Sequence, residues 1–287
     1  MSHSATARQI LQTVLPYLKT AGEYAHQIQS RIAEQPDKVD MPNFFAAALS
    51  DADLSVQTFV EVALLAHFPN IRFFGEEHEK SYNTKYFSSI ELGQGEELLV
   101  TLDPIDGTRF YLDNFPNFQI ILTVLNADGY EGVLALSPAK QEYFYALKDQ
   151  GTFRGAWEDG LEACELMTMW PNSEKPRLLL GFAMQSWAEQ MEQSFSLIKV
   201  AEDYSAEELI PNVNGILTGD LDGAILAKGN WIDGGAIAFL VQEAGGVVTD
   251  LEGHPLPSLR DCEDCRFSGM IIAANSDIHQ QILRHRS

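Results

Sequence analysis

The sequence predicts an α/β protein in which helix and sheet layers alternate. Its first half reads as two helices followed by an antiparallel series of strands, and its second half alternates strands with helices. The 287 residues are 45% hydrophobic and 21% charged, a globular composition with enough apolar side chains for a large core. We expect a single domain over residues 1–287, with lobes at about residues 1–154 and 155–287.

The elements of the first half follow from hydrophobic periodicity and turn residues. Apolar side chains at helical spacing predict helices over residues 5–33 and 53–68. A short strand is expected to end at Gly75, and the polar, glycine-bearing residues 78–97 are expected to be a loop. Buried strands are predicted in ELLVTLD, NFQIILTVL, GVLALS and EYFYALKDQGTF, with a hairpin turn at NADGYE.

The second half, which starts near Gly155, has the alternation typical of α/β proteins. Strands are predicted in RLLLGFA, GAILA, GVVTD and GMIIAA. Helices are predicted in SWAEQMEQSFSLIKV, in WIDGGAIAFLVQEAGG and in SDIHQQILRH. Gly245 and Gly246 would close the second of these helices, and Ser276 would be the N-cap of the third.

The charge and the cysteines indicate what the protein binds and where it works. The net charge is −22 and the sequence has no basic stripe, which argues against a nucleic-acid polymer or an anionic membrane as partner. Residues Met1–Arg8 lack the apolar region of a signal peptide, and no apolar run reaches membrane-spanning length. The three cysteines are an odd, low count that favours a reducing compartment, so we predict a cytoplasmic protein.

The segment LDPIDGT carries the strongest chemical signal. Asp103 ends a buried strand, Asp106 lies three residues later, and Gly107 provides the backbone freedom of a tight turn. Two carboxylates this close repel each other unless one is protonated, with a raised pKa, or a divalent cation lies between them. The N–H groups after Asp106 could begin a short helix and bind a phosphate. Taken alone, the segment could also be an ordinary Asp-Pro and Asp-Gly turn.

Two further acidic positions lie at the ends of predicted elements. Glu76 and Glu77 follow a strand and Gly75, and Asp233 precedes a long apolar helix. Solvated loop glutamates, and an aspartate that compensates the helix dipole, are the ordinary interpretations. Three acidic clusters at element ends together favour a site for divalent cations and a phosphate.

These motifs, in this order, resemble the inositol monophosphatase family. They are GEE at Gly75–Glu77, DPIDGT at Asp103–Thr108 and WIDGGAIAFLVQEAGG at Trp231–Gly246, so the resemblance covers nearly the whole chain. The segment LSDADLSVQ resembles the family's acidic helix start and places Asp53 at the acidic position, with Asp51 and helix capping as alternatives. The resemblance implies an αβαβα sandwich, often homodimeric, and a Mg²⁺-dependent phosphomonoesterase.

The resemblance also implies metal ligands. One Mg²⁺ would be bound by Glu76, Asp103 and the Ile105 carbonyl. A second would be bound by Asp103, Asp106 and Asp233, so that Asp103 bridges the two ions. A third, weaker ion could join through Glu76, which gives two or three Mg²⁺ per site.

Roles in catalysis and substrate binding are implied in the same way. Glu76 and Thr108 would orient the attacking water, and Asp53 would act in catalysis beside them. The backbone of Gly107 and Thr108 would receive the phosphate. The substrate-binding residues would be Gly107, Thr108, Asp106 and Asp233.

Three departures from the family pattern bear on the substrate. Ile232 separates Trp231 from Asp233, where the family usually has the tryptophan directly before the aspartate. The family's Gly-Ser-Ala segment is replaced here by YSAEELIPNVNG. The position at which the family has a glutamate that holds a hydroxyl of inositol falls near Leu226. The resemblance therefore implies a small phosphorylated metabolite as substrate: an inositol phosphate, a sugar phosphate, histidinol phosphate or a 3′-phosphonucleotide. A family member that binds metal and phosphate without turnover is the alternative.

Overall fold

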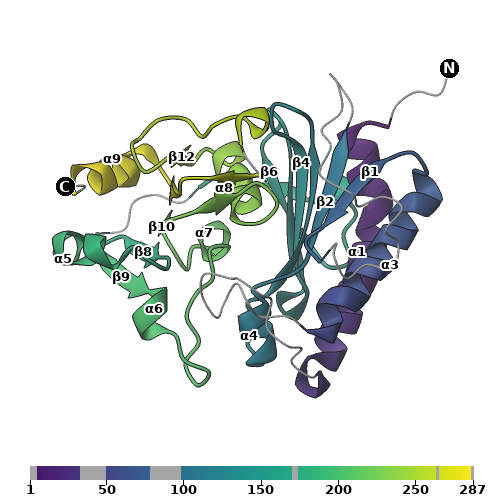
Figure 1. Ribbon diagram of the computed structural model, residues 1–287, viewed down its shortest axis with the longest axis horizontal. Coiled ribbons are helices and arrows are strands. Elements are labelled where there is room, and N and C mark those ends of the chain that lie inside the picture. Colours follow the sequence, from purple (N-terminus) through teal and green to yellow (C-terminus); the bar gives the residue numbers. More distant parts are fainter. Residues whose placement is uncertain (1–4, 33–49, 78–97, 170–173, 263–264, 286–287) are drawn as a thin grey trace. The chain divides into compact units, whose positions relative to one another are not determined.

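The computed structural model describes residues 5–32, 50–77, 98–169, 174–262 and 265–285 of the chain. They belong to two compact units, Met1–Lys148 with Phe153–Glu165 and Asp149–Thr152 with Leu166–Ser287. Each unit combines helices with a sheet, which confirms the α/β class (Figure 1). The loop predicted over residues 78–97 lies outside the described residues.

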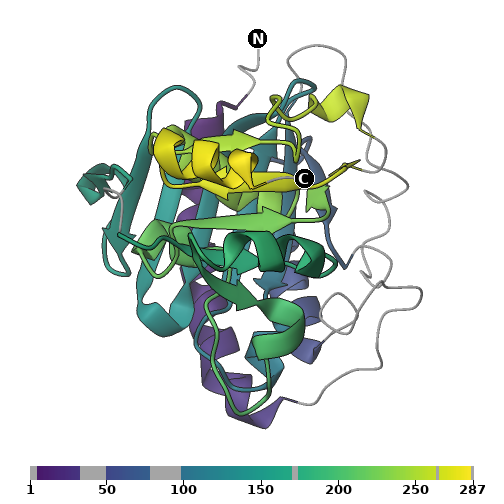
Figure 2. The ribbon, with the colours of Figure 1, turned by 90° about the vertical axis from the view of Figure 1, so that its left-hand side faces the viewer.

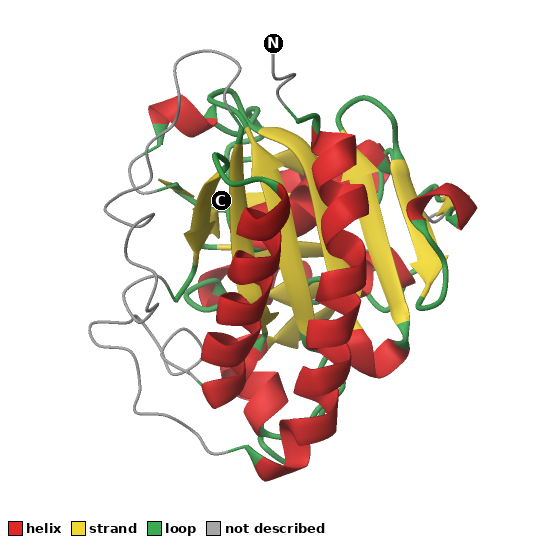
Figure 3. Ribbon diagram, turned by 90° about the vertical axis from the view of Figure 1, so that its right-hand side faces the viewer, coloured by secondary structure: helices red, strands yellow, loops and turns green. Residues whose placement is uncertain are grey.

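Two long helices, α1 (Ala7–Ile28) and α3 (Asp51–His67), lie side by side over one face of the first unit's sheet (Figure 3). The first begins with a capping box, in which the Thr6 hydroxyl accepts a hydrogen bond from the Gln9 N–H and the Gln9 side chain accepts one from the Thr6 N–H. A short 3₁₀ turn, η1 (Gln29–Arg31), follows α1. The two predicted helices are therefore confirmed, with slightly shifted ends.

The sheet of the first unit has seven strands in sequence order. The pair β1–β2 is parallel, whereas β2–β3, β3–β4 and β4–β5 are antiparallel. The antiparallel series is confirmed from β2 onward, whereas β1 runs parallel to its neighbour β2. The two strands are separated by 23 residues, and a connection of this length allows the crossover that a parallel pair needs. The strands are β1 (Arg72–Gly75), β2 (Leu99–Asp106), β3 (Gln119–Leu125), β4 (Tyr130–Ser137), β5 (Glu142–Leu147), β6 (Thr152–Ala156) and β7 (Glu165–Leu166).

Both faces of β3 are buried, and they differ in character. Ile120, Leu122 and Val124 belong to the hydrophobic core that includes the inner faces of α1 and α3. The alternate residues, which include Gln119 and Thr123, lie on the other face of the strand and are fully buried as well. The short elements of this unit are α4 (Thr108–Leu112), η4 (Pro138–Lys140) and η5 (Leu161–Ala163).

The second unit has a five-stranded sheet of order β12-β14-β10-β8-β9 and a two-stranded pair, β11–β13. The strands are β8 (Arg177–Leu180), β9 (Ser196–Lys199), β10 (Gly223–Leu226), β11 (Gly229–Asn230), β12 (Val247–Thr249), β13 (Arg266–Phe267) and β14 (Met270–Ala273). The helices are η6 (Gln185–Trp187), α5 (Ala188–Met191), α6 (Val200–Asp203), α7 (Gly215–Thr218), α8 (Gly234–Glu243), η7 (Leu259–Asp261) and α9 (Ser276–Arg284). Helix α9 crosses in front of this sheet in Figure 2 and buries Ile278 and Ile282 in the unit's core.

Two predictions for the second unit are wrong. Residues 186–200 are not one helix, because their last third forms β9, which pairs in parallel with β8 and buries Ile198. Sheet pairing here overrides the local helix preference. The N-cap of α9 is Asn275 rather than Ser276, since the Asn275 side chain accepts hydrogen bonds from the backbone N–H groups of Asp277 and Ile278.

Among the described residues, no helix combines the length and the hydrophobicity needed to cross a membrane.

Candidate active site

The parallel pair β1–β2 places Glu76 beside Asp103. Gly75 is paired with Leu102, and the Glu76 N–H donates a hydrogen bond of 2.9 Å to the Leu102 carbonyl. Both strands run in the same direction, so the residue that follows each of these partners lies at the same edge of the sheet. Two acidic positions that are 27 residues apart in the chain therefore become neighbours.

A β-bulge in β2 places the side chains of Asp103 and Asp106 on the same side of the strand. Asp103 pairs with Ile121 and Asp106 with Gln119, so three steps along β2 correspond to two steps along β3. Residues three apart in a regular strand point to opposite faces, and one extra residue returns the second side chain to the first face. A carboxylate oxygen of Asp103 accordingly lies within 4.8 Å of one from Asp106.

Hydrogen bonds orient both carboxylates. Asp103 is buried, and its Oδ1 accepts a hydrogen bond of 3.1 Å from the Ile105 N–H. Asp106 is half-buried, and its Oδ2 accepts one of 2.7 Å from Nε2 of Gln119. Each carboxylate is thus held in one rotation, which favours a specific cation geometry over a solvated acidic loop.

Asp53 contacts Thr108 and also caps its own helix. Its Oδ2 accepts hydrogen bonds from the N–H and the hydroxyl of Ser50, at 2.8 and 2.6 Å. Its Oδ1 lies 3.2 Å from Oγ1 of Thr108, and the same hydroxyl lies 2.9 Å from the Ile105 carbonyl. The hydroxyl carries one proton, so these two oxygens are alternative acceptors for it. Asp51 is exposed on the same helix turn. The two interpretations of Asp53, cap and site residue, are therefore compatible, and the geometry favours Asp53 over Asp51.

Gly107 forms the turn that starts α4. Its φ of 82° is a left-handed conformation that favours glycine, as the sequence predicted. Tyr111 on α4 is fully buried and donates a 2.7 Å hydrogen bond to the Ala25 carbonyl. Burial raises the pKa of Tyr111, and the charge of Asp53 adds to this effect. Tyr111 is therefore a neutral support under the turn.

Two glutamines near the acidic positions were missed by the sequence predictions. Gln57 on α3 packs against Gly75, where a Cβ atom would lie only 2.1 Å from its Oε1, and this oxygen accepts a 2.9 Å hydrogen bond from the Glu77 N–H. Gln119 binds Asp106. A lone amide inside an otherwise apolar strand or helix face is the signal that could have identified both.

Asp233 belongs to the second unit, where it is the N-cap residue of α8. Its carbonyl accepts a 2.7 Å hydrogen bond from the Ala236 N–H, while within the described part of the chain its side chain makes no capping hydrogen bond. The side chain is exposed at the start of the helix. The metal-binding role of Asp233 remains a prediction.

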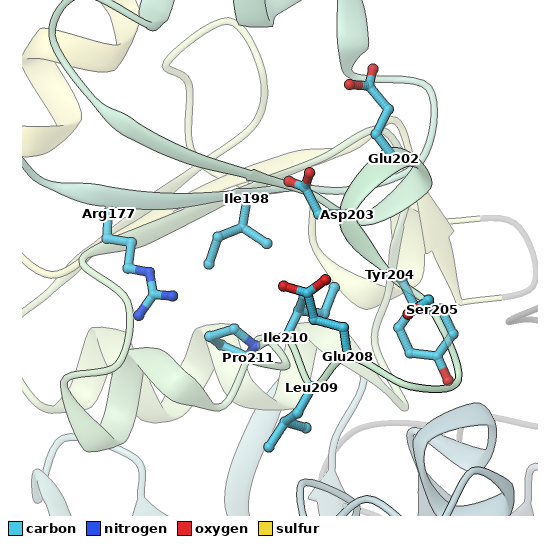
Figure 4. A pocket seen from close by; sticks show the side chains of 10 residues that line it. All are labelled: Arg177, Ile198, Glu202, Asp203, Tyr204, Ser205, Glu208, Leu209, Ile210 and Pro211. Carbon is cyan, nitrogen blue, oxygen red and sulfur yellow. The ribbon is translucent and has the colours of Figure 1, made fainter.

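The segment that replaces the family's Gly-Ser-Ala sequence lines a cavity of about 380 Å³ in the second unit (Figure 4). Ile198, Ile210 and Pro211 provide an apolar wall. The charged side chains around it are those of Arg177, Glu202, Asp203 and Glu208. The segment that differs from the family pattern thus contributes most of the residues around a polar surface cavity.

The donor set of the first unit fits a hard divalent cation. Glu76, Asp103 and Asp106 offer carboxylate oxygens and Ile105 offers a carbonyl, the ligand types that Mg²⁺ prefers. Two oxygens bound to one Mg²⁺ at about 2.1 Å are at most about 4.2 Å apart. The separation of less than 4.8 Å between Asp103 and Asp106 needs only a small adjustment to meet this geometry.

Comparison with known proteins identifies the family. The model of the inositol monophosphatase family matches residues 10–287. A putative Nus factor SuhB of Neisseria meningitidis serogroup B is 24% identical over 284 residues, 94% of this chain and 97% of the relative. A histidinol-phosphatase of Streptomyces coelicolor is 26% identical over 189 residues, 63% of this chain and 66% of the relative.

A solved structure shares the fold. It is an IMPase/NADP phosphatase complexed with Mg²⁺ and phosphate, with a TM-score of 0.69 and 16% identity over 97% of this chain and 95% of that chain. The family match extends over far more than half of the sequence. The chain therefore belongs to the inositol monophosphatase family, which acts on small phosphate substrates, and it is a phosphoric monoester hydrolase.

Proposed function

We propose that the protein is a Mg²⁺-dependent phosphomonoesterase that hydrolyses a small phosphorylated metabolite by direct attack of water. The observation that carries this proposal is the pair of oriented carboxylates, Asp103 and Asp106, at the sheet edge where Glu76 also lies. Bound magnesium would supply the positive charge that stabilises the phosphoryl group and lowers the pKa of a water. The Mg²⁺ in the related IMPase/NADP phosphatase structure supports this choice of metal.

The residues of the first unit would hold the metal together with Asp233 of the second unit. Glu76, Asp103 and the Ile105 carbonyl form the first proposed ligand set. The second proposed set would be Asp103, Asp106 and Asp233, with a third and weaker ion through Glu76. Several carboxylates in one site repel each other, and this repulsion favours cation binding.

Thr108 and Glu76 would orient the attacking water. When the Thr108 hydroxyl donates its one proton to Oδ1 of Asp53, 3.2 Å away, its lone pairs can accept a hydrogen bond from the water. Glu76 is half-buried next to the same strand end and would accept the one proton that this water loses when its oxygen bonds to phosphorus. Asp53 would hold the Thr108 hydroxyl in this orientation.

The phosphate would be received by the backbone N–H groups of Gly107 and Thr108. These groups lie at the turn into α4, directly after Asp106. N–H groups at a helix start point away from the helix and are suitable donors to phosphate oxygens. The substrate-binding residues of the proposal are thus Gly107, Thr108, Asp106 and Asp233.

The substrate is a small metabolite with a phosphate monoester. The relatives named above include a histidinol-phosphatase and an IMPase/NADP phosphatase, which differ widely in the group that carries the phosphate. This variation agrees with the altered segment Tyr204–Gly215 and with Leu226 in β10, where the features expected for inositol are missing.

We further propose that the enzyme is a cytoplasmic homodimer that binds no nucleic-acid polymer.

A second candidate function is that of a metal- and phosphate-binding protein without turnover. A relative that covers 94% of this chain is named a putative Nus factor, a name that describes no enzymatic activity. This candidate predicts binding of Mg²⁺ and phosphate but no release of phosphate from an ester.

The two candidates are separated by measuring phosphate release from an aryl phosphate with Mg²⁺, and again after chelation of the metal. The phosphatase is expected to release phosphate only with metal, and a panel of phosphorylated metabolites would then identify the substrate. A folded protein that binds Mg²⁺, yet releases no phosphate from any panel member, would establish the second candidate.

A further inference from the structure

Gln119 is a buried amide in contact with a proposed metal ligand. It is the first residue of β3, it is paired with Asp106 on β2, and its side chain is fully buried. Its Nε2 lies 2.7 Å from Oδ2 of Asp106. A hydrogen bond to a carboxylate at this distance is strong, and burial of the donor shields it from competition by water.

The carboxylate determines which way the amide faces. An ionised aspartate can only accept hydrogen bonds, so the amide nitrogen of Gln119 must face Asp106 and the amide oxygen must face away. This Oε1 is buried and has no hydrogen-bond partner among the residues that the structure describes. An unsatisfied buried acceptor destabilises a fold, whereas an apolar residue of similar shape would not. The cost at Oε1 opposes the gain from the hydrogen bond at Nε2, so stability alone does not explain why this position is glutamine.

We propose that Gln119 is a positioning residue that sets the rotation of the Asp106 carboxylate for cation binding; this inference rests on the proposed metal-dependent function. The contact fixes Oδ2, so that the carboxylate does not rotate when it receives a metal. A neutral amide suits this role because it orients the carboxylate without neutralising its charge. A lysine or arginine in the same place would compete with the cation for the same anion.

The neighbouring contact around Asp103 shows the same arrangement. There the backbone N–H of Ile105 donates to Oδ1 at 3.1 Å. One carboxylate is thus oriented by the backbone of its own turn, and the other by a side chain from the adjacent strand. The metal affinity of Asp106 is therefore open to change by a single substitution on β3.

The test compares Gln119→Leu with Thr123→Val in the 287-residue chain. Leucine removes both the donor to Asp106 and the unsatisfied acceptor, with little change in volume. Thr123 lies on the same face of β3, and its hydroxyl forms a buried 2.6 Å hydrogen bond with Thr101 of β2. Mn²⁺ affinity is measured by calorimetry, together with the melting temperature of the metal-free protein and the Mg²⁺ dependence of phosphate release.

The proposal predicts opposite patterns for the two variants. Gln119→Leu is expected to weaken Mn²⁺ binding about 10–100-fold, with little change in the melting temperature of the metal-free protein, because the lost bond to Asp106 and the removed unsatisfied acceptor oppose each other. Its activity is expected to return to within about threefold of the parent at saturating Mg²⁺, a recovery that structural damage would not allow. Thr123→Val is expected to lower the melting temperature and keep the parent's Mn²⁺ affinity.

Each contrary result has a distinct meaning. Unchanged Mn²⁺ affinity in Gln119→Leu, with the parent binding Mn²⁺ normally, would overturn the inference alone. Equal losses of affinity in both variants would also overturn it, because a general loosening of β3 would then be the cause. A parent protein that binds no Mn²⁺ would overturn the proposed function, and the role of Gln119 with it.

Discussion

The hydroxyl of Thr108 lies 3.2 Å from Oδ1 of Asp53, although 55 positions separate the two residues in the chain. The contact joins the first turn of α3 to the turn that follows β2. Asp53 reaches it with one oxygen while the other accepts hydrogen bonds from Ser50, so the same side chain caps its helix and fixes a proposed catalytic hydroxyl. Helix position and site geometry are therefore coupled through one carboxylate.

This coupling predicts the effect of Thr108→Val. The substitution keeps the shape of the side chain but removes the hydroxyl that would orient water, and kcat is expected to fall about 100-fold or more. Thr108→Ser restores the hydroxyl and is expected to retain most of the activity. Thr58→Val serves as the control, because that hydroxyl is exposed and bonds only to the Leu54 carbonyl of its own helix among the described residues. Equal activity of the valine and serine variants at position 108 would contradict the proposed role.

Asp103→Asn tests the bridging ligand. The amide has nearly the same shape as the carboxylate but lacks its charge, so phosphate release is expected to fall about 1,000-fold or more and Mn²⁺ affinity to fall with it. The melting temperature of the metal-free protein is expected to stay the same or rise, since the repulsion between Asp103 and Asp106 is removed. Retention of most of the turnover would refute the metal assignment.

Gly75→Ala tests how closely α3 holds the strand end that carries Glu76. A Cβ atom at position 75 would lie 2.1 Å from Oε1 of Gln57, a buried side-chain end that would have to move and give up its hydrogen bond to the Glu77 N–H. We therefore expect a loss of about 1–3 kcal/mol in the free energy of unfolding, with a loss of activity. Gly160→Ala is the matched control, because a Cβ atom there meets no described atom within 4 Å and the backbone has φ −83°.

Truncation of the opposing side chain provides a second check on this clash. The double variant Gly75→Ala with Gln57→Ala should lose less stability than the sum of the two single variants, since the alanine at position 57 removes the atoms that clash. Chemical denaturation of all four proteins measures the coupling. Strictly additive losses would show that Gln57 does not constrain this strand end.

His279 makes the stability of the second unit dependent on pH. Its side chain on α9 is 7% exposed, its Nε2 lies 2.8 Å from the Thr249 hydroxyl, and burial lowers its pKa from the usual 6.5. Because the unfolded chain binds the proton more readily, this stabilisation is complete above pH 6.5 and is lost as the pH falls through the lowered pKa. The slope is at most about 1.4 kcal/mol per pH unit for one proton.

Urea denaturation between pH 5 and pH 8 measures this effect. The variant His279→Gln should have a smaller loss of stability toward acid than the parent. The exposed His254 provides the control: the His254→Gln variant should still show the loss of stability toward acid that comes from His279. An identical pH dependence of the parent and the His279→Gln variant would contradict this assignment.

Most elements of the fold were predictable because their signals are local. The helices α1 and α3, the strands around the NADGYE turn and the helix α8 follow from hydrophobic spacing and turn residues. The strand β9 was not predictable in this way. Residues 196–199 continue a helical pattern in sequence, and only the parallel edge offered by β8 makes them a strand.

By itself, the sequence determined the family and the acidic positions Glu76, Asp103, Asp106 and Asp233, because each lies in a short contiguous motif whose spacing is visible in the chain. The tertiary structure alone decided that β1 and β2 are parallel and that a bulge turns Asp103 and Asp106 to one side. It also decided that Gln57 binds the Glu77 backbone and Gln119 the Asp106 carboxylate at the candidate site. The physical reason is that a hydrogen-bond partner is chosen by strand register and distance in space. Neither is encoded in the linear spacing of two residues that are far apart in the chain.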